Sequence, residues 1–306
     1  MGNWTIDSVT DLTGKNVIVT GANTGLGFAT TKALASKGAN VIMACRSNQR
    51  ATDAKNKILE TNPDAKLDIM LLDLGNLSKV EKFAKGYIDK YKTLDILINN
   101  AGVMTTPYMK TEDGFEFQNG VNHLGHFALT AHLFDLLKNT KDSRLVIVSS
   151  IAHKSGKMNF DNYMFENQKE YTPMKSYSQS KLSNLLFMFE LNRRIKDQNL
   201  DIKVVAAHPG VSRTELTRYM LKGILAYIAL PLMWLFTQSP KRGAEPQIRA
   251  ALDPSVTTAD YYGPSGLKEM RGKAVKTVAL SHAHNEKDAK TLWELSEKLT
   301  NIEFNV

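Results

Sequence analysis

Several kinds of site require residues that this 306-residue sequence lacks, because it has one cysteine, Cys45, and no uninterrupted apolar run of membrane-spanning length. A single thiol forms no internal disulfide and no metal-binding cluster, which predicts a reducing, cytoplasmic compartment. A transmembrane helix needs about 20 apolar residues, whereas the most apolar segment, 221–237, is shorter and contains Pro231. Residues 1–15 have no apolar run, and Ile6 stands where myristoylation requires Ser or Thr, so we expect neither a signal peptide nor a lipid anchor.

The sequence also lacks a dense basic segment, although its formal charge is +8. Its 39 lysines and arginines are scattered along the chain rather than gathered with aromatic residues into one run. Proteins that bind nucleic acids usually concentrate such residues in a patch, so we expect no nucleic-acid partner. The excess positive charge instead provides a mild field that attracts a phosphate-bearing cofactor.

What the sequence does contain is a regular alternation of short β-branched runs with helical segments, such as residues 27–37 and 48–60. This alternation is typical of βαβ units around a parallel sheet. The runs are too continuously apolar to leave one face in water, so we predict an α/β fold with helices on both faces of a doubly wound sheet. The predicted strands are Asn16–Thr20, Ala39–Ala44, Leu67–Leu72, Leu94–Asn99, Arg144–Ser149 and Ile202–Ala207.

The chain is expected to form a single domain over residues 1–306, because no linker or internal repeat interrupts the alternation before about residue 210. We place a cofactor-binding and catalytic core at 12–214 and a C-terminal elaboration at 215–306. Within the elaboration, residues 263–272 are predicted as a loop. Residues 289–299 are predicted as a closing helix with Trp293 packed inward.

The first chemical signal is a glycine-rich turn between the first predicted strand and the first helix, Thr20–Gly27. Glycines there permit a tight turn and let backbone N–H groups and the positive helix end approach a pyrophosphate. An ordinary strand-to-helix connection is the alternative, and the spacing departs from the commoner Gly-x-Gly-x-x-Gly pattern. The candidate cofactor contacts in this turn are Gly21, Asn23, Thr24, Gly25, Leu26 and Gly27.

Further polar motifs follow the next predicted strands, at the carboxyl edge where an open α/β sheet binds its ligand. Arg46-Ser47 follows the second strand, Asp73-Leu74 the third, and Asn99-Asn100-Ala101-Gly102 the fourth. Taken alone, Asp73 is equally consistent with a helix cap and Asn99 with a turn. Their joint placement favours a cofactor site.

A tyrosine and a lysine, Tyr177 and Lys181, are four residues apart in a helical segment and therefore share one helix face. A free tyrosine titrates near pH 10, about three units above the range that suits a general acid or base at neutral pH. A positive charge about 4 Å away stabilises phenolate by roughly 4 kcal/mol, or about three pK units. We therefore predict that Lys181 lowers the pKa of Tyr177, although such pairs also occur by chance on many helices.

Taken in order, these motifs resemble the short-chain dehydrogenase/reductase family. The resemblance rests on Thr-Gly-x-x-x-Gly-x-Gly at Thr20–Gly27, on Asn-Asn-Ala-Gly at Asn99–Gly102 and on Tyr-x-x-x-Lys at Tyr177–Lys181. It is strong from Leu12 to about Thr214 and looser beyond. It implies a Rossmann-type fold and an enzyme that transfers a hydride between a nicotinamide cofactor and a small carbonyl or alcohol substrate.

The resemblance also assigns roles to individual residues of this chain. Tyr177 would be the proton donor and acceptor, Lys181 would bind the nicotinamide ribose, and Ser150 would orient the substrate oxygen. Asn122 would hold a water in the proton path, with a structural helix residue as its alternative. Ser149 is less favoured than Ser150. Residues expected against the cofactor also include Asp73 and Leu74 near adenine, Asn100, Ala101 and Gly102, and Pro209, Gly210, Val211 and Thr214 near the carboxamide.

The residue that follows the second strand bears on the choice of cofactor. An acidic side chain there would accept a hydrogen bond from a free ribose 2′-hydroxyl, whereas this sequence has Arg46, whose guanidinium suits a 2′-phosphate. We therefore prefer NADP(H) over NAD(H). Many NADP-using relatives carry a second basic residue in the glycine-rich turn where this chain has Thr24, so Arg46, with Ser47 and Asn23, would hold the phosphate without it.

The segment between Ser150 and Tyr177 spans 27 positions, which is longer than in many short-chain dehydrogenases. Together with Met43–Arg46 and Asn122–Phe127, it resembles the branch of retinol dehydrogenases, WW-domain oxidoreductases and protochlorophyllide reductase. The branch implies an apolar aldehyde, ketone or alcohol. The aromatic residues of the segment that we expect to help select the substrate are Phe160, Tyr163, Phe165 and Tyr171.

Other interpretations stay open at this point. Segment 221–237 is favoured as a lid over the substrate, ahead of an oligomer or membrane-surface contact and ahead of a membrane span; a homo-oligomer is compatible with the sequence. Histidines 123, 126 and 132 raise the idea of a metal site, but no carboxylate or thiol cluster accompanies them, and we expect no metal. The alternative functions are a cofactor-sensing regulator and a sugar-nucleotide epimerase or dehydratase.

Overall fold

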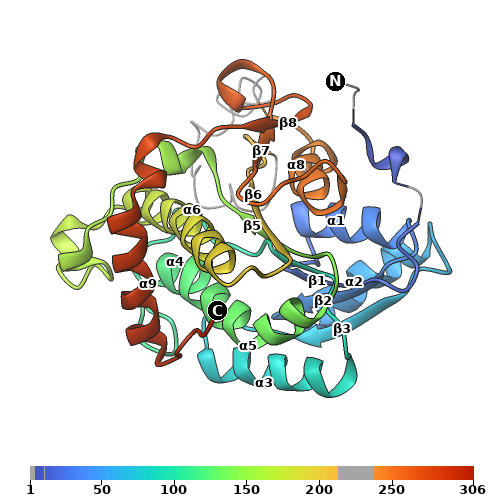
Figure 1. The fold of residues 1–306 in the computed structure, drawn as a ribbon, viewed down its shortest axis with the longest axis horizontal. Coiled ribbons are helices and arrows are strands. Elements are labelled where there is room, and N and C mark those ends of the chain that lie inside the picture. Colours follow the sequence, from blue (N-terminus) through green and yellow to red (C-terminus); the bar gives the residue numbers. More distant parts are fainter. Residues whose placement is uncertain (1–3, 10, 213–236) are drawn as a thin grey trace, which may run out of the picture.

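The computed structural model describes residues 4–9, 11–212 and 237–306. Its centre is one eight-stranded sheet of order β3-β2-β1-β4-β5-β6-β7-β8, in which only β7 and β8 pair antiparallel (Figure 1). The strands are β1 Asn16–Thr20, β2 Asn40–Cys45, β3 Leu67–Leu71, β4 Ile96–Asn99, β5 Ser143–Val148, β6 Ile202–Ala207, β7 Tyr261–Pro264 and β8 Ala274–Thr277. The predicted α/β fold with a doubly wound, largely parallel sheet is therefore confirmed.

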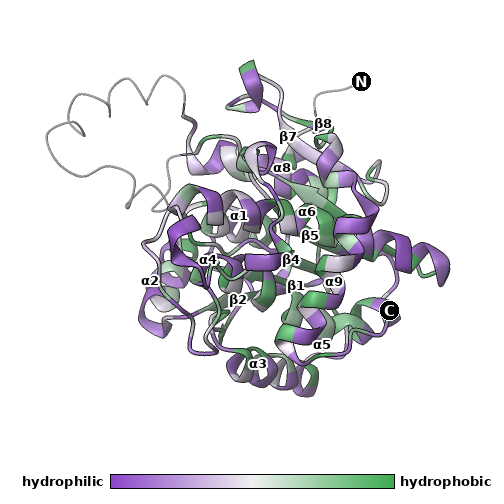
Figure 2. Ribbon diagram, turned by 90° about the vertical axis from the view of Figure 1, so that its left-hand side faces the viewer, coloured by the Kyte–Doolittle hydropathy of each residue, from purple (hydrophilic) through white to green (hydrophobic). Residues whose placement is uncertain are grey.

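Helices cover both faces of the sheet, as Figure 1 shows. One face carries α1 Gly25–Ala35, α2 Asn48–Leu59 and α8 Pro240–Leu252. The other carries α3 Leu77–Lys90, the short α4 Phe117–Asn119, α5 Gly125–Asn139 and α6 Pro173–Asp197, with α9 Glu286–Thr300 packed on α6. Alternate strand residues enter two separate cores, so that Val17 and Val19 pack on the α1 side and Ile18 on the α5 side. Figure 2 shows the hydrophobic residues concentrated inside this arrangement.

The six predicted strands are present with shifts of one or two residues at their ends, but the prediction missed β7 and β8. The prediction of a loop over 263–272 is accordingly wrong at its start, where Gly263 and Pro264 belong to β7. Both strands have only four residues, and glycine and proline are poor indicators of a strand. Gly263 is required there because a Cβ atom would collide with the imidazole of His208.

The predicted closing helix is present as α9, and Trp293 is buried in it. Its indole stacks on Phe304 at 4.9 Å between ring centroids and meets Phe127 edge-on at 5.4 Å. These contacts fix the C-terminal residues against α5 and α6. In the part of the chain that the structure describes, no helix is both long and apolar enough to cross a membrane.

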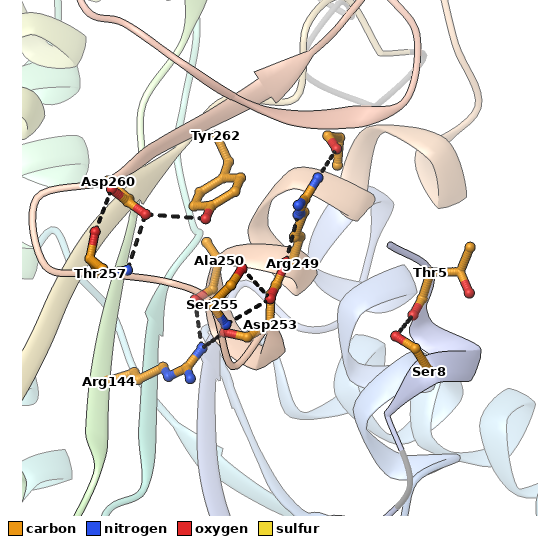
Figure 3. A network of polar contacts seen from close by, with 11 residues as sticks. Thr5, Ser8, Arg144, Arg249, Ala250, Asp253, Ser255, Thr257, Asp260 and Tyr262 are labelled. Carbon is orange, nitrogen blue, oxygen red and sulfur yellow. Dashed lines mark hydrogen bonds and ion pairs between the residues drawn. The ribbon is translucent and has the colours of Figure 1, made fainter. Parts of the chain in front are cut away.

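A buried polar network ties α8 to the amino end of β5, on the opposite edge of the sheet from the predicted site (Figure 3). Arg144 donates hydrogen bonds to the carbonyl oxygens of Ala250 and Asp253, the latter at 2.9 Å. The Asp253 carboxylate accepts from Arg249 Nε at 2.9 Å and from Ser255. Arg249 in turn donates to the carbonyl of Ala274 in β8. Arg249 thus joins α8 to β8, and Arg144 joins the end of α8 to β5.

Replacing Asp253 by alanine is expected to destabilise the fold by about 2 kcal/mol, because the half-buried Arg249 guanidinium loses its charged partner and Ser255 loses its acceptor. The measurement is the free energy of unfolding in urea. The matched control is Asp201→Ala, which removes an exposed carboxylate and is expected to change stability by less than about 0.5 kcal/mol. Equal stability of the two variants would show that the network contributes nothing.

Candidate active site

Four neighbouring strands, β1, β4, β5 and β6, bring the predicted site residues to one edge of the sheet. All four are parallel, so their carboxyl ends lie on the same side. The glycine-rich turn follows β1, the Asn-Asn-Ala-Gly segment follows β4, Ser150 follows β5 and Pro209 follows β6. The structure therefore assembles motifs that are far apart in the sequence at the position where such sheets bind ligands.

The proposed catalytic residues are all buried at this edge: Asn122, Ser150, Tyr177 and Lys181. Tyr177 and Lys181 lie in α6, whose first turn is capped by the Thr172 hydroxyl. The Lys181 ammonium lies 5.9 Å from the centre of the Tyr177 ring and donates a hydrogen bond to the carbonyl of Val148 at 3.1 Å. The predicted proximity of the two side chains is thus present.

The pKa of Tyr177 differs from the prediction. Burial raises the pKa of the phenol above its ordinary value, and the hydrogen bond with the Ser150 hydroxyl opposes only part of that effect. The expected lowering by Lys181 is absent in this geometry. The prediction of a lowered pKa for Tyr177 considered only the charge of Lys181 and left out desolvation, which disfavours the charged phenolate. Tyr177 is therefore protonated at neutral pH.

Lys181 is itself strongly perturbed. Burial lowers the pKa of its ammonium group to about 8, because the charge is removed from water. The Ser149 hydroxyl donates to the Lys181 carbonyl oxygen at 2.7 Å, so its proton is used in holding α6 against β5. The Ser150 hydroxyl accepts from Ala152 N and keeps its own proton available. This difference supports the choice of Ser150 over Ser149.

Asn122 lies in one turn of π-helix, Gly120–Leu124, between α4 and α5. Its side-chain oxygen accepts from Val103 N at 2.8 Å, and its amide donates to the Val103 carbonyl at 3.0 Å and to Ser180 Oγ at 2.9 Å. The side chain therefore bridges the segment after β4 to α6, one residue before Lys181. Its predicted role in a proton path stays a prediction.

The turn after β1 forms a cradle that only glycine allows. Gly21 and Gly25 have φ angles of +67° and +55°, and a Cβ atom on Gly27 would collide with the carbonyl of Gly21. A Cβ on Gly102 would lie 3.2 Å from Asn122 Oδ1 and 3.4 Å from Lys181 Nζ. Thr24 precedes α1 without a side-chain cap. These glycines let the turn after β1, the segment after β4 and Lys181 lie close together without side chains between them, which fits the close backbone approach that a dinucleotide requires.

The hydroxyl of Thr20 connects this turn to the segment after β4. It accepts hydrogen bonds from Asn100 N and Ala101 N, each at 2.9 Å, while the Asn100 amide donates to the Thr20 carbonyl at 2.7 Å. His126 Nε2 lies 3.0 Å from the same hydroxyl, and its Nδ1 lies 3.1 Å from the carbonyl of Asn122. His126 therefore links the two halves of the predicted site.

His123 and His126 are buried and make contacts within the protein. Burial lowers the pKa of His126 to about 4 and that of His123 to about 3, so both rings are neutral. His123 Nε2 contacts Ser296 Oγ of α9 at 2.8 Å. Over residues 4–9, 11–212 and 237–306, no three His, Cys, Asp or Glu side chains are placed to hold a metal ion.

Two basic side chains that the sequence analysis missed, Arg50 and Lys57, lie on the side of the site where we expect the adenosine half of the cofactor. A cleft beside the glycine-rich turn is lined by Asn23, Thr24 and Gly25 and, from α2, by Arg50, Asp53, Ala54 and Lys57. The α2 residues recur at helical spacing, a signal that could have revealed them once the turn had been located. Arg46 is exposed at the end of β2, and Ser47 Oγ caps α2 by accepting from Arg50 N.

Several predicted contact residues also form turns or pack against neighbouring helices. Asp73 Oδ1 accepts from Gly75 N at 3.0 Å and forms a turn, whereas the helix cap that was its alternative is provided by Asn76 at the start of α3. Leu74 and Leu26 are buried against neighbouring helices. In the long segment before Tyr177, the side chains of Tyr163 and Phe165 are likewise buried. Their predicted part in selecting the substrate stays a prediction.

Hydrogen bonds from residues later in the chain hold the backbone of the segment after β6. Gly210 has a φ angle of +61°, and Val211 N donates to the carbonyl of Met270 at 2.7 Å. The Pro209 carbonyl accepts from Gln238 Nε2 at 2.8 Å. Thr214 and the predicted lid, apart from Thr237, lie outside the described residues.

Comparison with known proteins agrees with this geometry. The model of the family described as short chain dehydrogenase matches residues 15–164. Retinol dehydrogenase 14 of Mus musculus is 40% identical over 302 residues, which cover 94% of this chain and 86% of that protein. Retinol dehydrogenase 13 of Homo sapiens is 40% identical over 293 residues, covering 95% and 86% of the two chains.

Two solved structures extend the comparison. An uncharacterised protein from Mycobacterium paratuberculosis is 35% identical, superimposes with a TM-score of 0.83 and matches 100% of both chains. A short-chain dehydrogenase from Shigella flexneri, solved in complex with NADP, shares the fold at 20% identity, with a TM-score of 0.62 over 81% of this chain and 95% of that one.

The similarities and the geometry agree on one class of protein, the NAD(P)-dependent oxidoreductases that act on CH–OH and C=O groups. With 40% identity over 94% of its length, the chain belongs to the short-chain dehydrogenase family, in the branch of the retinol dehydrogenases.

Proposed function

We propose that this protein is an NADP(H)-dependent oxidoreductase that interconverts an apolar carbonyl compound and its alcohol, with Tyr177 as general acid and base. The observation that carries the proposal is the burial of Ser150, Tyr177 and Lys181 next to a strip of glycines at the carboxyl edge of the sheet. The names of the retinol dehydrogenase relatives support an apolar substrate.

Tyr177, Ser150 and Lys181 each have a separate role in the proposed reaction. A bound nicotinamide dinucleotide supplies or accepts the hydride. Tyr177, protonated at neutral pH because burial raises its pKa, donates a proton to the substrate oxygen during reduction. Ser150, whose hydroxyl bonds to the same phenol, fixes that oxygen beside Tyr177. Lys181 would hold the ribose hydroxyls of the bound dinucleotide and so place the nicotinamide beside Tyr177.

The preference for NADP(H) rests on the cations beside the glycine-rich turn. Arg46 follows β2, and Arg50 and Lys57 line the cleft next to Asn23 and Thr24. Arg50 thus takes the place of the second basic residue that the turn itself lacks. A guanidinium suits a 2′-phosphate because it offers a planar fork of donors. Asp53 lines the same cleft.

Replacing Arg50 by alanine is expected to raise the dissociation constant for NADPH about tenfold and to leave that for NADH within about twofold, because a charged hydrogen bond contributes about 1.5 kcal/mol. The measurement is fluorescence titration with each dinucleotide. Lys55→Ala, on another face of α2 and outside the lining of the cleft, is the matched control. Equal losses for NADPH and NADH would contradict recognition of the 2′-phosphate by Arg50.

An absorbance screen of aldehydes, ketones and alcohols with NADPH and NADP⁺ tests the activity itself. We expect turnover of apolar compounds in both directions. Tight NADPH binding without turnover of any compound would favour a cofactor-sensing regulator. Turnover of a sugar nucleotide without net redox change would favour an epimerase.

A further inference from the structure

The connection between β7 and β8, residues 265–273, lies directly behind the Pro209–Val211 segment. The Met270 carbonyl accepts from Val211 N at 2.7 Å, and a Cβ atom on Gly210 would collide with that same carbonyl. On the other side, Gln238 donates to the Pro209 carbonyl and accepts from Gly272 N at 3.2 Å. These hydrogen bonds tie the backbone after β6 to the β7–β8 connection. A movement of the connection would therefore also move Pro209–Val211.

One carboxylate, that of Glu269, sits at the junction of this connection with the site. Its Oε2 lies 3.0 Å from Lys154 Nζ and 3.1 Å from His208 Nε2, while its Oε1 accepts from Thr277 Oγ1 at 3.1 Å. Lys154 lies in the short helix after Ser150, His208 directly follows β6 and Thr277 ends β8. Glu269 therefore joins the helical turn after Ser150 to the end of β6 and to β8, across the edge of the sheet.

The contact with His208 has a consequence for Gly210. Burial lowers the pKa of His208, so the ring is neutral and carries a single N–H. A carboxylate beside Nε2 places that proton on Nε2 and leaves Nδ1 as an acceptor. His208 Nδ1 in turn accepts from Gly210 N at 3.3 Å. The charge on Glu269 thereby fixes the tautomer that Gly210 requires.

The backbone at Glu269 also depends on these contacts. Lys268 and Glu269 have φ angles of +51° and +57°, a region that is unfavourable for residues with side chains. Such a conformation persists only where the surroundings enforce it. The pKa of Glu269 is lowered to about 2, chiefly by the contact with His208 and further by Lys154, so the carboxylate is charged throughout the neutral range.

We propose that Glu269 is a positioning residue that holds Pro209, Gly210 and Val211 in place for the nicotinamide half of the cofactor, acting through His208 and the Met270 carbonyl. The inference rests on the proposed function, because the nicotinamide is assigned to this segment. The adenosine half is expected on the other side of β1, near Arg46 and Arg50. Glu269 should therefore act on one half of the cofactor and not on the other.

The test compares Glu269→Gln with the unmodified protein for two ligands, NADPH and 2′,5′-ADP, which carries only the adenosine half. We expect the dissociation constant for NADPH to rise about tenfold and that for 2′,5′-ADP to stay unchanged. In ¹⁵N NMR, the protonated nitrogen of His208 should no longer be Nε2 alone. Glu286→Gln, an exposed carboxylate at the start of α9, is the matched control and should change neither ligand.

If the dissociation constants for both ligands rise equally, Glu269 has a general structural role and the proposal is overturned. Unchanged dissociation constants for both ligands would also overturn it. If Glu269→Gln does not fold, Glu269→Asp carries the same comparison, because it keeps the charge but withdraws the carboxylate from His208 Nε2. This test measures binding alone and does not depend on catalytic turnover. A protein that binds both ligands but reduces no carbonyl would refute the proposed function and leave this comparison intact.

Discussion

Tyr177→Phe is expected to lower kcat for carbonyl reduction by about 10²- to 10⁴-fold, the usual contribution of a general acid or base. The substitution removes one hydroxyl from a buried ring and leaves the ring in its place on α6. The glycine cradle and the cations of α2 do not contact that hydroxyl, so the dissociation constant for NADPH should change by less than about twofold. The measurements are steady-state kinetics and fluorescence titration.

The pH dependence of the reaction gives a second readout on the same residue. Because burial raises the pKa of Tyr177, the protonated phenol that reduction needs is present across the neutral range. Alcohol oxidation needs the phenolate and should therefore accelerate as the pH rises above neutral, whereas reduction should slow. Both slopes should vanish in the residual activity of Tyr177→Phe.

Tyr163→Phe is the matched control, since it removes a buried phenolic hydroxyl that contacts Ser183 at 3.0 Å, away from Ser150. Its kcat should stay within about twofold of the unmodified protein. Undiminished catalysis by Tyr177→Phe, or an equal loss in both variants, would refute the assignment of Tyr177.

The central strands and the main site motifs could be read from the sequence because each is a local signal. Val17–Val19 and Val146–Val148 are continuous apolar runs, and Tyr177 and Lys181 are one helical turn apart. By contrast, β7 and β8 exist because Tyr261 and Tyr262 pair with the end of β6 and then with residues 276 and 277. A four-residue strand containing glycine and proline carries no such signal on its own.

The errors at the site have the same origin. The sequence placed a lysine near a tyrosine but could not show how deeply the surrounding helices bury the phenol, and desolvation reverses the sign of the expected pKa shift. Arg50 was overlooked because its relevance depends on α2 lying beside the glycine-rich turn. Glu269 was overlooked because its partners Lys154 and His208 are more than 60 positions away in sequence.

Lys181→Met is expected to abolish most activity and yet to raise the stability of the protein. The ammonium group is buried, and among the residues that the structure describes no carboxylate forms an ion pair with it. The lowering of its pKa from 10.5 to about 8 corresponds to a penalty of roughly 3 kcal/mol for the charged form at neutral pH. Methionine fills a similar volume without that penalty.

The loss of one hydrogen bond offsets only part of this gain. The Val148 carbonyl, which accepts from Lys181, also accepts from Asn184 Nδ2 at 3.2 Å and so keeps a partner in the variant. We therefore expect a net increase of about 2 kcal/mol in the free energy of unfolding at pH 7. For a domain of this size, the increase corresponds to a rise in Tm of about 4 °C. Lys175→Met, at an exposed position of α6, should leave Tm unchanged.

The pH dependence of this difference identifies its cause. The folded protein releases the Lys181 proton near pH 8, whereas the unfolded chain keeps it until about pH 10.5, so the unmodified protein gains stability between these values. The advantage of Lys181→Met should therefore be complete below pH 8 and shrink as the pH approaches 10. A variant that is less stable than the unmodified protein at pH 7 would show that the ammonium group is stabilised by its surroundings. The expected result instead means that this fold retains an unfavourable buried charge because the reaction at Tyr177 requires it.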